Sequence, residues 1–359
     1  MTNDYLNSFY KKKIFITGHT GFKGAWFSLW LTKLGAKVKG YALKPEKKSL
    51  FNQIEPSLKI TSVFADIRDR EKLKKEILKF QPDFIFHLAA QPIVFESYKT
   101  PIETFETNII GTAHLLDALK FLKKKCAVVI ITTDKVYQNI EKNYAYKETD
   151  KLGGYDPYSA SKAAAELIID SYRSSFFNPE NFNMHKKAIA SARAGNVIGG
   201  GDYAKDRLVP DIFKALCKGD SILVRNPDAV RPWQHVLESL SGYLQLAFFL
   251  YKEPQKFATS FNFGPALKDT KSVEHLVKRA IASWGAGNYH NSTPGNAPHE
   301  AGLLKLNIEK AKNELGWMPR WNSDLAIDKT IQWYRNSIQK NSDIFNLCIN
   351  NINDFVKYK

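Results

Sequence analysis

The 359-residue chain has only three cysteines, Cys126, Cys217 and Cys348, and they lie far apart in the sequence. Their odd number and wide spacing match neither a disulfide framework nor a metal-ligand pattern, so we expect reduced thiols and no metal site. Long apolar runs are also missing, because stretches such as 127–131 are too short to cross a bilayer. The N-terminus lacks the hydrophobic segment of a secretory signal. These absences predict a cytoplasmic protein with no membrane partner.

Acidic residues are scarcer than basic ones, 36 against 52, which gives a formal net charge of +16. A basic protein could bind nucleic acid, but its lysines are scattered through predicted helices such as 70–79 and 119–125, where they form solvated faces. Recognised nucleic-acid-binding modules and interleaved surface aromatics are not visible. We therefore expect no nucleic-acid partner, while attraction of an anionic small substrate is compatible with the excess charge.

The first half of the sequence alternates short β-rich runs with segments of helical periodicity. Strands are predicted at 14–17, 37–41, 61–65, 84–88 and 128–132, and helices at 22–34, 69–80, 103–122 and from about 158. Such alternation is typical of a parallel sheet covered on both faces. The predicted fold is α/β, a Rossmann-like doubly wound parallel sheet.

Beyond Gly199 the alternation weakens and the glycine, proline and tryptophan content rises, which indicates a smaller mixed α/β C-terminal substrate lobe. We expect a dinucleotide-binding Rossmann domain over 10–198 plus 232–264. A nucleotide-sugar-binding lobe is expected over 199–231 plus 265–340, and a terminal helix or tail over 341–359.

Three glycines, Gly18, Gly21 and Gly24, lie where the first predicted strand meets the first predicted helix. Glycines there permit a tight turn and let backbone amides approach a pyrophosphate, which the positive end of a helix also favours. Asp66, after the third strand, is compatible either with contact to an adenine edge or with a helix cap. The second strand lacks the acidic residue that usually binds the ribose of NAD, so the choice between NAD and NADP stays open.

Tyr158 and Lys162 lie one turn apart on one face of a predicted helix. An ammonium beside a phenol stabilises the phenolate, so we expect the pKa of Tyr158 to fall from about 10 towards the range of a general base. Thr133, at the end of a neighbouring strand, could hydrogen-bond the same substrate oxygen. Asp134 and Lys135 follow it directly, and an acid next to a potential base can perform an elimination.

Longer motifs carry a family resemblance, and they occupy 18–24, 87–91, 133–137, 152–158, 191–202, 206–210, 230–236 and 261–264. The glycine loop, the Tyr158/Lys162 pair and Asn196 resemble the extended short-chain dehydrogenase/reductase superfamily that acts on nucleotide sugars. The longer motifs resemble the CDP-glucose 4,6-dehydratases within it. The similarity runs from about Ile14 to Trp321, nearly the whole chain.

This resemblance implies an NAD-dependent dehydration of CDP-glucose, serving deoxysugar and surface polysaccharide synthesis. Tyr158, assisted by Lys162 and Thr133, would take the proton of the C4 hydroxyl while hydride leaves C4. Asp134 would then protonate the departing C6 hydroxyl. Lys135 would be the base at C5, or it would only stabilise the enolate by its charge, since a lysine is a base only when its pKa is lowered.

The resemblance also implies the remaining binding residues and a homodimer or homotetramer that pairs through the helices near Glu103 and Tyr158. Besides Tyr158 and Lys162, the cofactor-binding residues would be Gly18, Thr20, Gly21, Phe22, Lys23, Gly24, Asp66, Ile67, Leu88, Ala89, Ala90, Asn108 and Thr132. The substrate-binding residues would be Gln91, Asn196, Arg207, Arg225, Arg231 and His299, and a structural salt bridge is an equal alternative for Arg225.

Two other functions compete with this one. A 4-epimerase, or a dehydratase of another nucleotide sugar, needs the Tyr158/Lys162 pair, but an epimerase has no use for Asp134 beside Lys135. A non-catalytic NAD-binding scaffold would keep the glycine loop and lose the catalytic side chains, all of which are present here. The sequence therefore favours dehydration.

Overall fold

The computed structural model describes residues 4–291 and 303–358. At its centre is a seven-stranded sheet in the order β12-β7-β5-β4-β1-β2-β3, with every neighbouring pair parallel. Its strands are β1 (Lys13–Thr17), β2 (Lys37–Ala42), β3 (Thr61–Phe64), β4 (Phe84–His87), β5 (Cys126–Ile131), β7 (Lys187–Ala194) and β12 (Ser260–Phe263). The predicted Rossmann-like fold is confirmed.

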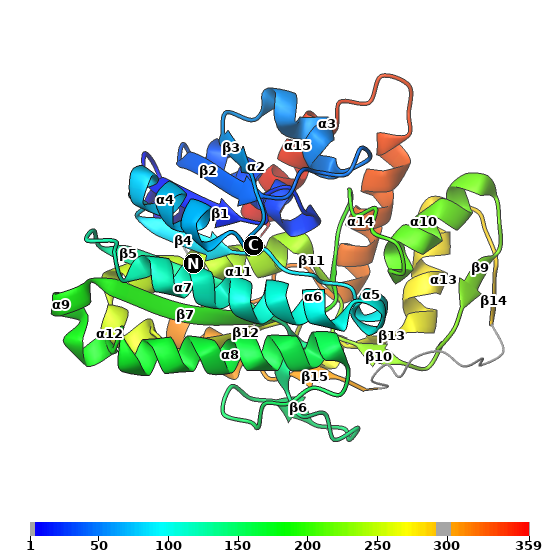
Figure 1. Cartoon of the computed structure of the whole chain (residues 1–359). Coiled ribbons are helices and arrows are strands. Elements are labelled where there is room, and N and C mark those ends of the chain that lie inside the picture. The colour runs from blue at the N-terminus through cyan, green and yellow to red at the C-terminus, as the bar shows by residue number, and fades with distance from the viewer. Residues whose placement is uncertain (1–3, 292–302, 359) are drawn as a thin grey trace.

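Helices cover both faces of this sheet and form a three-layered body (Figure 1). On one face lie α4 (Arg70–Phe80), α6 (Pro101–Phe105), η2 (Glu106–Ile110), α7 (Gly111–Leu119) and α8 (Pro157–Ser175). On the other lie α2 (Phe22–Lys33), α11 (Val236–Lys252), α12 (Pro254–Phe257) and α15 (Ile344–Lys357). Strands covered on both faces of a sheet commonly form continuous apolar runs, and β5 is such a run, with all six residues apolar and buried.

The helix predicted over 103–122 differs from the structure in one detail, because a π-helical segment, η2, interrupts it. Single π turns are typical of functional sites, where they redirect a side chain. Here the segment contains Asn108, which is 1% exposed. Its amide nitrogen donates to Ser161 Oγ on α8 at 2.8 Å, so the two helices are joined at this point.

A smaller group of elements lies beside the carboxyl ends of the strands, at the right of Figure 1. It contains α10 (Leu208–Lys218), β9 (Ile222–Val224), β10 (Val230–Arg231), β13 (Lys271–Ser272), α13 (Val273–Trp284) and β14 (Tyr289–Asn291). The pair β9–β14 is parallel and β10–β13 is antiparallel, so this lobe is mixed as predicted. The exact domain boundaries stay a prediction.

The remaining elements are short, apart from one longer helix, α14 (Ser323–Ser337). They are α1 (Asp4–Asn7), α3 (Leu50–Ile54), η1 (Glu55–Ser57), α5 (Val94–Lys99), η3 (Asp134–Val136), β6 (Ala145–Tyr146), η4 (Pro179–Asn181), α9 (Phe182–His185), β8 (Val197–Ile198), β11 (Gln234–His235), η5 (Leu267–Asp269), β15 (Lys305–Leu306) and η6 (Ala311–Leu315). Among the helices in the described ranges, none combines the length and apolar character that crossing a membrane requires.

Candidate active site

A cavity of about 1080 Å³ lies at the carboxyl ends of the central strands, where the sheet order reverses between β1 and β4. Open parallel sheets bind ligands at this place. The sequence-predicted residues that line it are Gly18, Thr20, Gly21, Phe22, Lys23, Gly24, Asp66, Ile67, Leu88, Ala89, Ala90, Thr132, Thr133, Asp134, Lys135, Tyr158, Lys162, Asn196, Arg207, Arg225 and Arg231. His299 lies outside the described residues.

The glycine turn wraps tightly around the first residues of α2. Gly18 has a φ of +75°, and a methyl group there would lie 2.6 Å from the backbone nitrogen of Ala89. A methyl group at Gly24 would lie 2.1 Å from Gly18 O. Gly21 is the N-cap of α2 and brings no capping side chain to the helix amides. These amides and the helix dipole form a site suited to a phosphate group.

Asp66 lines the cavity after β3, but its carboxylate is already occupied by a neighbour. It accepts hydrogen bonds from the backbone nitrogen of Arg68 at 2.8 Å and from the guanidinium, with Nη2 at 2.8 Å. These bonds lower the pKa of Asp66. The cap of the next helix is Asp69 instead, which accepts from Lys72 N at 3.1 Å, so Asp66 organises the turn at the cavity edge.

Gln91 and Asn108 are not part of the cavity lining, and they bind each other. Gln91 N donates to Asn108 Oδ1 at 2.9 Å, and Asn108 Nδ2 donates to Gln91 O at 3.1 Å. The Gln91 amide also donates to Thr104 Oγ1 at 2.9 Å. Both side chains therefore hold the loop after β4 in place, and their contacts with cofactor or substrate stay a prediction.

Thr133 and Asp134 follow β5 and enter the cavity together. Thr133 Oγ1 donates to Asp134 Oδ1 at 2.9 Å, and Asn196 Nδ2 donates to Asp134 Oδ2 at 3.2 Å. Asp134 is 1% exposed. Burial raises the pKa of its carboxyl, although Lys135 and the Thr133 hydrogen bond oppose the change. A carboxyl that keeps its proton more firmly than usual is suited to act as an acid.

Tyr158 and Lys162 come from the first two turns of α8, and both are buried. Burial raises the pKa of Tyr158 to about 12, with the hydrogen bond to Thr133 opposing the change and the charge of Asp134 adding to it. The expected fall of this pKa is therefore not seen. Burial also lowers the pKa of Lys162 to about 8, and its Nζ donates to Ile131 O at 3.3 Å. Desolvation thus has the largest effect on the pKa of both groups.

Lys23, in the first turn of α2, adds a further amine to the cavity lining. Its Nζ lies 3.5 Å from the hydroxyl oxygen of Tyr243. Burial lowers the pKa of Lys23 to about 7, and the charges of Arg207 and Lys162 add to the effect. The cavity therefore gathers several cationic groups, which suits an anionic ligand.

The arginines predicted from the lobe line the cavity in different ways. Arg207 Nη1 donates to Asp202 Oδ2 at 2.9 Å. Arg231 is 5% exposed and donates to Val230 O at 3.1 Å. The Arg225 guanidinium lies over the ring of Phe95, 5.6 Å from its centroid, so its contact is a cation–π contact to α5.

Two residues of the site escaped the sequence interpretation. Gly195 leaves space for Asp134, because a methyl group at position 195 would lie 1.7 Å from Asp134 Oδ2. Phe95 lines the cavity from α5 and contacts Arg225. Gly195 lies within a recognised motif, but its role depends on a side chain 61 positions earlier. The sequence around Phe95 has no motif that would mark it as a residue of the site.

Comparisons with known proteins agree with this geometry. The sequence model of the GDP-mannose 4,6 dehydratase family matches residues 15–330. A CDP-glucose 4,6-dehydratase from Salmonella typhimurium is 50% identical over 325 residues, covering 90% of each chain. The crystal structure of a dTDP-glucose 4,6-dehydratase from Streptomyces venezuelae, with NAD bound, has a TM-score of 0.76 at 23% identity and covers 90% of this chain and 97% of its own.

Proposed function

Because the chain belongs to the GDP-mannose 4,6 dehydratase family, we propose that it is an NAD-dependent CDP-glucose 4,6-dehydratase. It converts CDP-glucose to CDP-4-keto-6-deoxyglucose, a precursor of deoxysugars for a surface polysaccharide. The observation that carries this proposal is the meeting of Thr133, Asp134 and Lys135 with Tyr158 and Lys162 at one cavity. The 50% identity to a CDP-glucose 4,6-dehydratase supports the nucleotide. We also propose that it works in the cytoplasm.

The shape of the glycine turn fits a dinucleotide. Space for a pyrophosphate at the start of α2 depends on Gly18 and Gly24, where a methyl group would meet backbone atoms at 2.6 and 2.1 Å. Thr20, Asp66 and Ile67 line the neighbouring part of the cavity, which suits the adenosine end. A bound nicotinamide would supply hydride acceptance from C4 and hydride donation to C6.

In the first step, Tyr158 takes the proton of the C4 hydroxyl as C4 is oxidised to a ketone. The hydrogen bond between Tyr158 and Thr133 and the charge of Arg207 both lower the pKa of Tyr158 against the larger effect of burial. Lys162, whose pKa lies at about 8, carries a positive charge at neutral pH in most molecules. These groups favour the phenolate that the step requires.

In the second step, water is lost across C5 and C6. The 4-ketone acidifies the C5 proton, which a base removes while Asp134 donates its proton to the departing C6 hydroxyl. Burial raises the pKa of Asp134, which supports its role as the acid. Lys135 also lines the cavity and either removes the C5 proton or stabilises the enolate. The hydride then returns to C6 and a proton returns to C5, which gives the 4-keto-6-deoxy product.

The substrate diphosphate needs positive charge and amide donors. Arg207 and Arg231 line the lobe side of the cavity with Asn196, and we propose that they contact the diphosphate. Arg225 lies over Phe95, and this pair is suited to the base end of the nucleotide, since a planar guanidinium and a ring both stack on a pyrimidine.

The experiment is to incubate the enzyme with CDP-glucose that carries deuterium at C4. Dehydration transfers the label to C6 with loss of water, while a 4-epimerase retains it at C4 of a galactose product. A scaffold would consume no substrate with either NAD or NADP added. Parallel reactions with the UDP-, dTDP- and GDP-sugars measure the choice of nucleotide, and faster turnover of any of these would contradict the CDP assignment.

We also propose a homodimer or homotetramer that pairs through α6–α7 and α8, which lie side by side on one face (Figure 1). Large apolar side chains are exposed there, with Ile102 64% exposed and Leu167 60% exposed. Leu167→Glu should dissociate the oligomer in sedimentation analysis, whereas Met184→Glu, at an 85% exposed residue of α9, should not. A monomeric wild-type protein would contradict the proposal.

A further inference from the structure

Glu166 is a buried carboxylate on α8 that neither proposed step uses. It follows Lys162 by four residues and Tyr158 by eight, so the three side chains share one face of the helix. Its side chain is 1% exposed. Burying a carboxylate is costly unless it is fully paired, so its partners indicate what it does.

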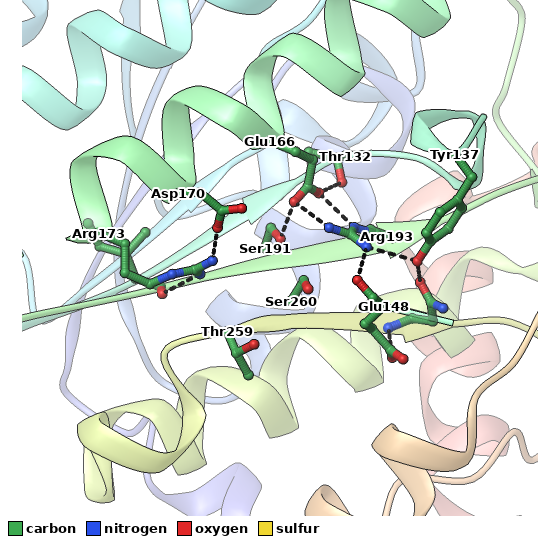
Figure 2. Close-up of polar contacts among 12 residues, drawn as sticks. Thr132, Tyr137, Glu148, Glu166, Asp170, Arg173, Ser191, Arg193, Thr259 and Ser260 are labelled. Atoms are coloured by element: carbon green, nitrogen blue, oxygen red, sulfur yellow. Dashed lines mark hydrogen bonds and ion pairs between the residues drawn. The ribbon is translucent and has the colours of Figure 1, made fainter. Parts of the chain in front are cut away.

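Figure 2 shows that these partners come from β7 and from Thr132, which follows the neighbouring strand β5. Each carboxylate oxygen accepts two hydrogen bonds. Oε2 accepts from Arg193 Nη2 at 2.9 Å and from Ser191 Oγ at 2.7 Å, both on β7. Oε1 accepts from Arg193 Nε at 3.1 Å and from Thr132 Oγ1 at 2.5 Å. Arg193 also donates to the Tyr137 hydroxyl at 2.9 Å, so the network is well satisfied.

The bond to Thr132 links this network to the site. Thr132 follows β5 and directly precedes Thr133 and Asp134, whose side chains enter the cavity. The Thr132 hydroxyl donates to Glu166, which lies on the same helix as Tyr158 and Lys162. Glu166 therefore joins the two groups of residues to which we assign oxidation and elimination.

Charge links Glu166 to Lys162 as well. Burial lowers the pKa of Lys162 to about 8, and the negative charge of Glu166 raises it against that effect. Lys23 from α2 and His87 from β4 also face this ammonium, and its charge lowers the pKa of both. His87 has a pKa of about 3 and is neutral at physiological pH. Glu166 is thus a negative group that favours the charged form of Lys162.

We propose that Glu166 is a positioning residue for the dehydration. With Arg193 as its counter-ion, it fixes the end of β5 through Thr132 and supports the positive charge of Lys162. The inference rests on the proposed function, because the reaction it serves is the C4 oxidation by Tyr158 and Lys162. An ion pair with only a structural role would hold α8 against β7 and would leave the ionisation of Lys162 unchanged.

The test is the pH profile of kcat for Glu166→Gln, which keeps the shape and removes the charge. We expect the alkaline limb to move to lower pH by about one unit, since loss of a nearby opposite charge shifts a pKa by about 1–3 units. Asp170→Asn is the matched control, because Asp170 lies one turn further along α8 and pairs with Arg173 at the surface. Its profile should match that of the wild type. An unchanged profile for Glu166→Gln would overturn the charge part of the proposal.

Thr132→Val tests the link to β5, because it removes the hydroxyl and keeps the shape. We expect kcat to fall about tenfold or more with KM within about twofold, as expected when reacting groups are misplaced by a fraction of an ångström. A wild-type kcat would refute the link. If Glu166→Gln does not fold, the double variant Glu166→Gln/Arg193→Met removes both charges, which buried pairs tolerate better. Its alkaline limb should move in the same direction but by less, because loss of the Arg193 charge acts on Lys162 in the opposite sense.

A second measurement is independent of the substrate. The rate at which acetic anhydride labels Lys162, followed by peptide mass spectrometry across pH, gives the midpoint of its ionisation. The midpoint should lie lower in Glu166→Gln than in the wild type and Asp170→Asn. If CDP-glucose is not turned over, the proposed function fails, and this labelling still decides the role of Glu166. Equal midpoints would refute that role.

Discussion

Alanine at Gly195 would disturb the proposed acid directly. A methyl group at this position would lie 1.7 Å from Asp134 Oδ2 and 2.0 Å from Asp134 Cγ, whereas real Cβ contacts essentially never fall below 3.0 Å. The backbone of Gly195 does not adopt a positive φ, so alanine itself fits the chain. The strain falls on the Asp134 carboxyl, which must move by more than about 1 Å.

This movement has a calculable effect on the chemistry. It breaks the hydrogen bond from Asn196 Nδ2, now 3.2 Å long, and takes the carboxyl away from Thr133. A misplacement of about 1 Å costs roughly a hundredfold in rate. We therefore expect Gly195→Ala to lose roughly a hundredfold in the rate of water loss, while C4 oxidation, which depends on Tyr158, falls by less than about tenfold.

The assay combines two measurements on the same variant. Single-turnover absorbance of the reduced nicotinamide follows C4 oxidation, and formation of the 4-keto-6-deoxy product follows water loss. Gly264→Ala is the control, because a methyl group there meets nothing closer than 3.7 Å, and it should retain wild-type rates. Normal water loss by a folded Gly195→Ala enzyme would refute the placement of the acid at Asp134.

Three further predictions concern single side chains. Asp134→Asn should slow water loss by about 10²–10⁴-fold and accumulate reduced nicotinamide in the absorbance assay, since general acids contribute this much. Lys135→Met should stop solvent deuterium exchange at C5 if Lys135 is the base, and an unchanged exchange rate would leave it only the enolate role. Burial raises the pKa of Glu238 from 4.5 to about 8, so folding is stabilised below pH 4.5 and loses about 5 kcal/mol as pH rises to 8. Other buried groups titrate between pH 5 and pH 9 as well, so the measurement is the difference between variants. Between these two pH values the unfolding free energy of the wild type and of the exposed control Glu55→Gln should change by about 4 kcal/mol less favourably than that of Glu238→Gln in urea unfolding.

Much of the fold could be predicted from local patterns. Strands such as β5 are continuous apolar runs, and helices such as α4 bury one face and begin after a capping aspartate, so their ends were found within a few residues. The π turn at 106–110 could not be predicted, because it depends on where Asn108 meets Gln91 and Ser161. Two-residue strands such as β10 also carry no pattern, since their pairing partners lie far along the chain.

The position of the site could also be predicted from the sequence, because the carboxyl ends of parallel strands meet at one edge of the sheet. The pKa shifts of its side chains could not be predicted. Charge attraction between Tyr158 and Lys162 follows from their spacing, but burial has the larger effect on both, and burial is a property of the folded chain. The space that Gly195 leaves for Asp134 depends likewise on a contact between separate strand ends.

The two proposed steps are connected through the charge of Asp134. An ionised Asp134 raises the pKa of Tyr158 and so opposes the phenolate that begins the reaction. Burial, however, raises the pKa of Asp134 itself and favours its neutral form. In its protonated form Asp134 does not oppose the phenolate, and it carries the proton that the C6 hydroxyl needs, whereas its ionised form raises the pKa of Tyr158. On this reasoning Asp134→Asn, which is neutral at every pH, should shift the ionisation of Tyr158 to lower pH while water loss is blocked, and a pH profile of C4 oxidation that moves to higher pH would contradict it.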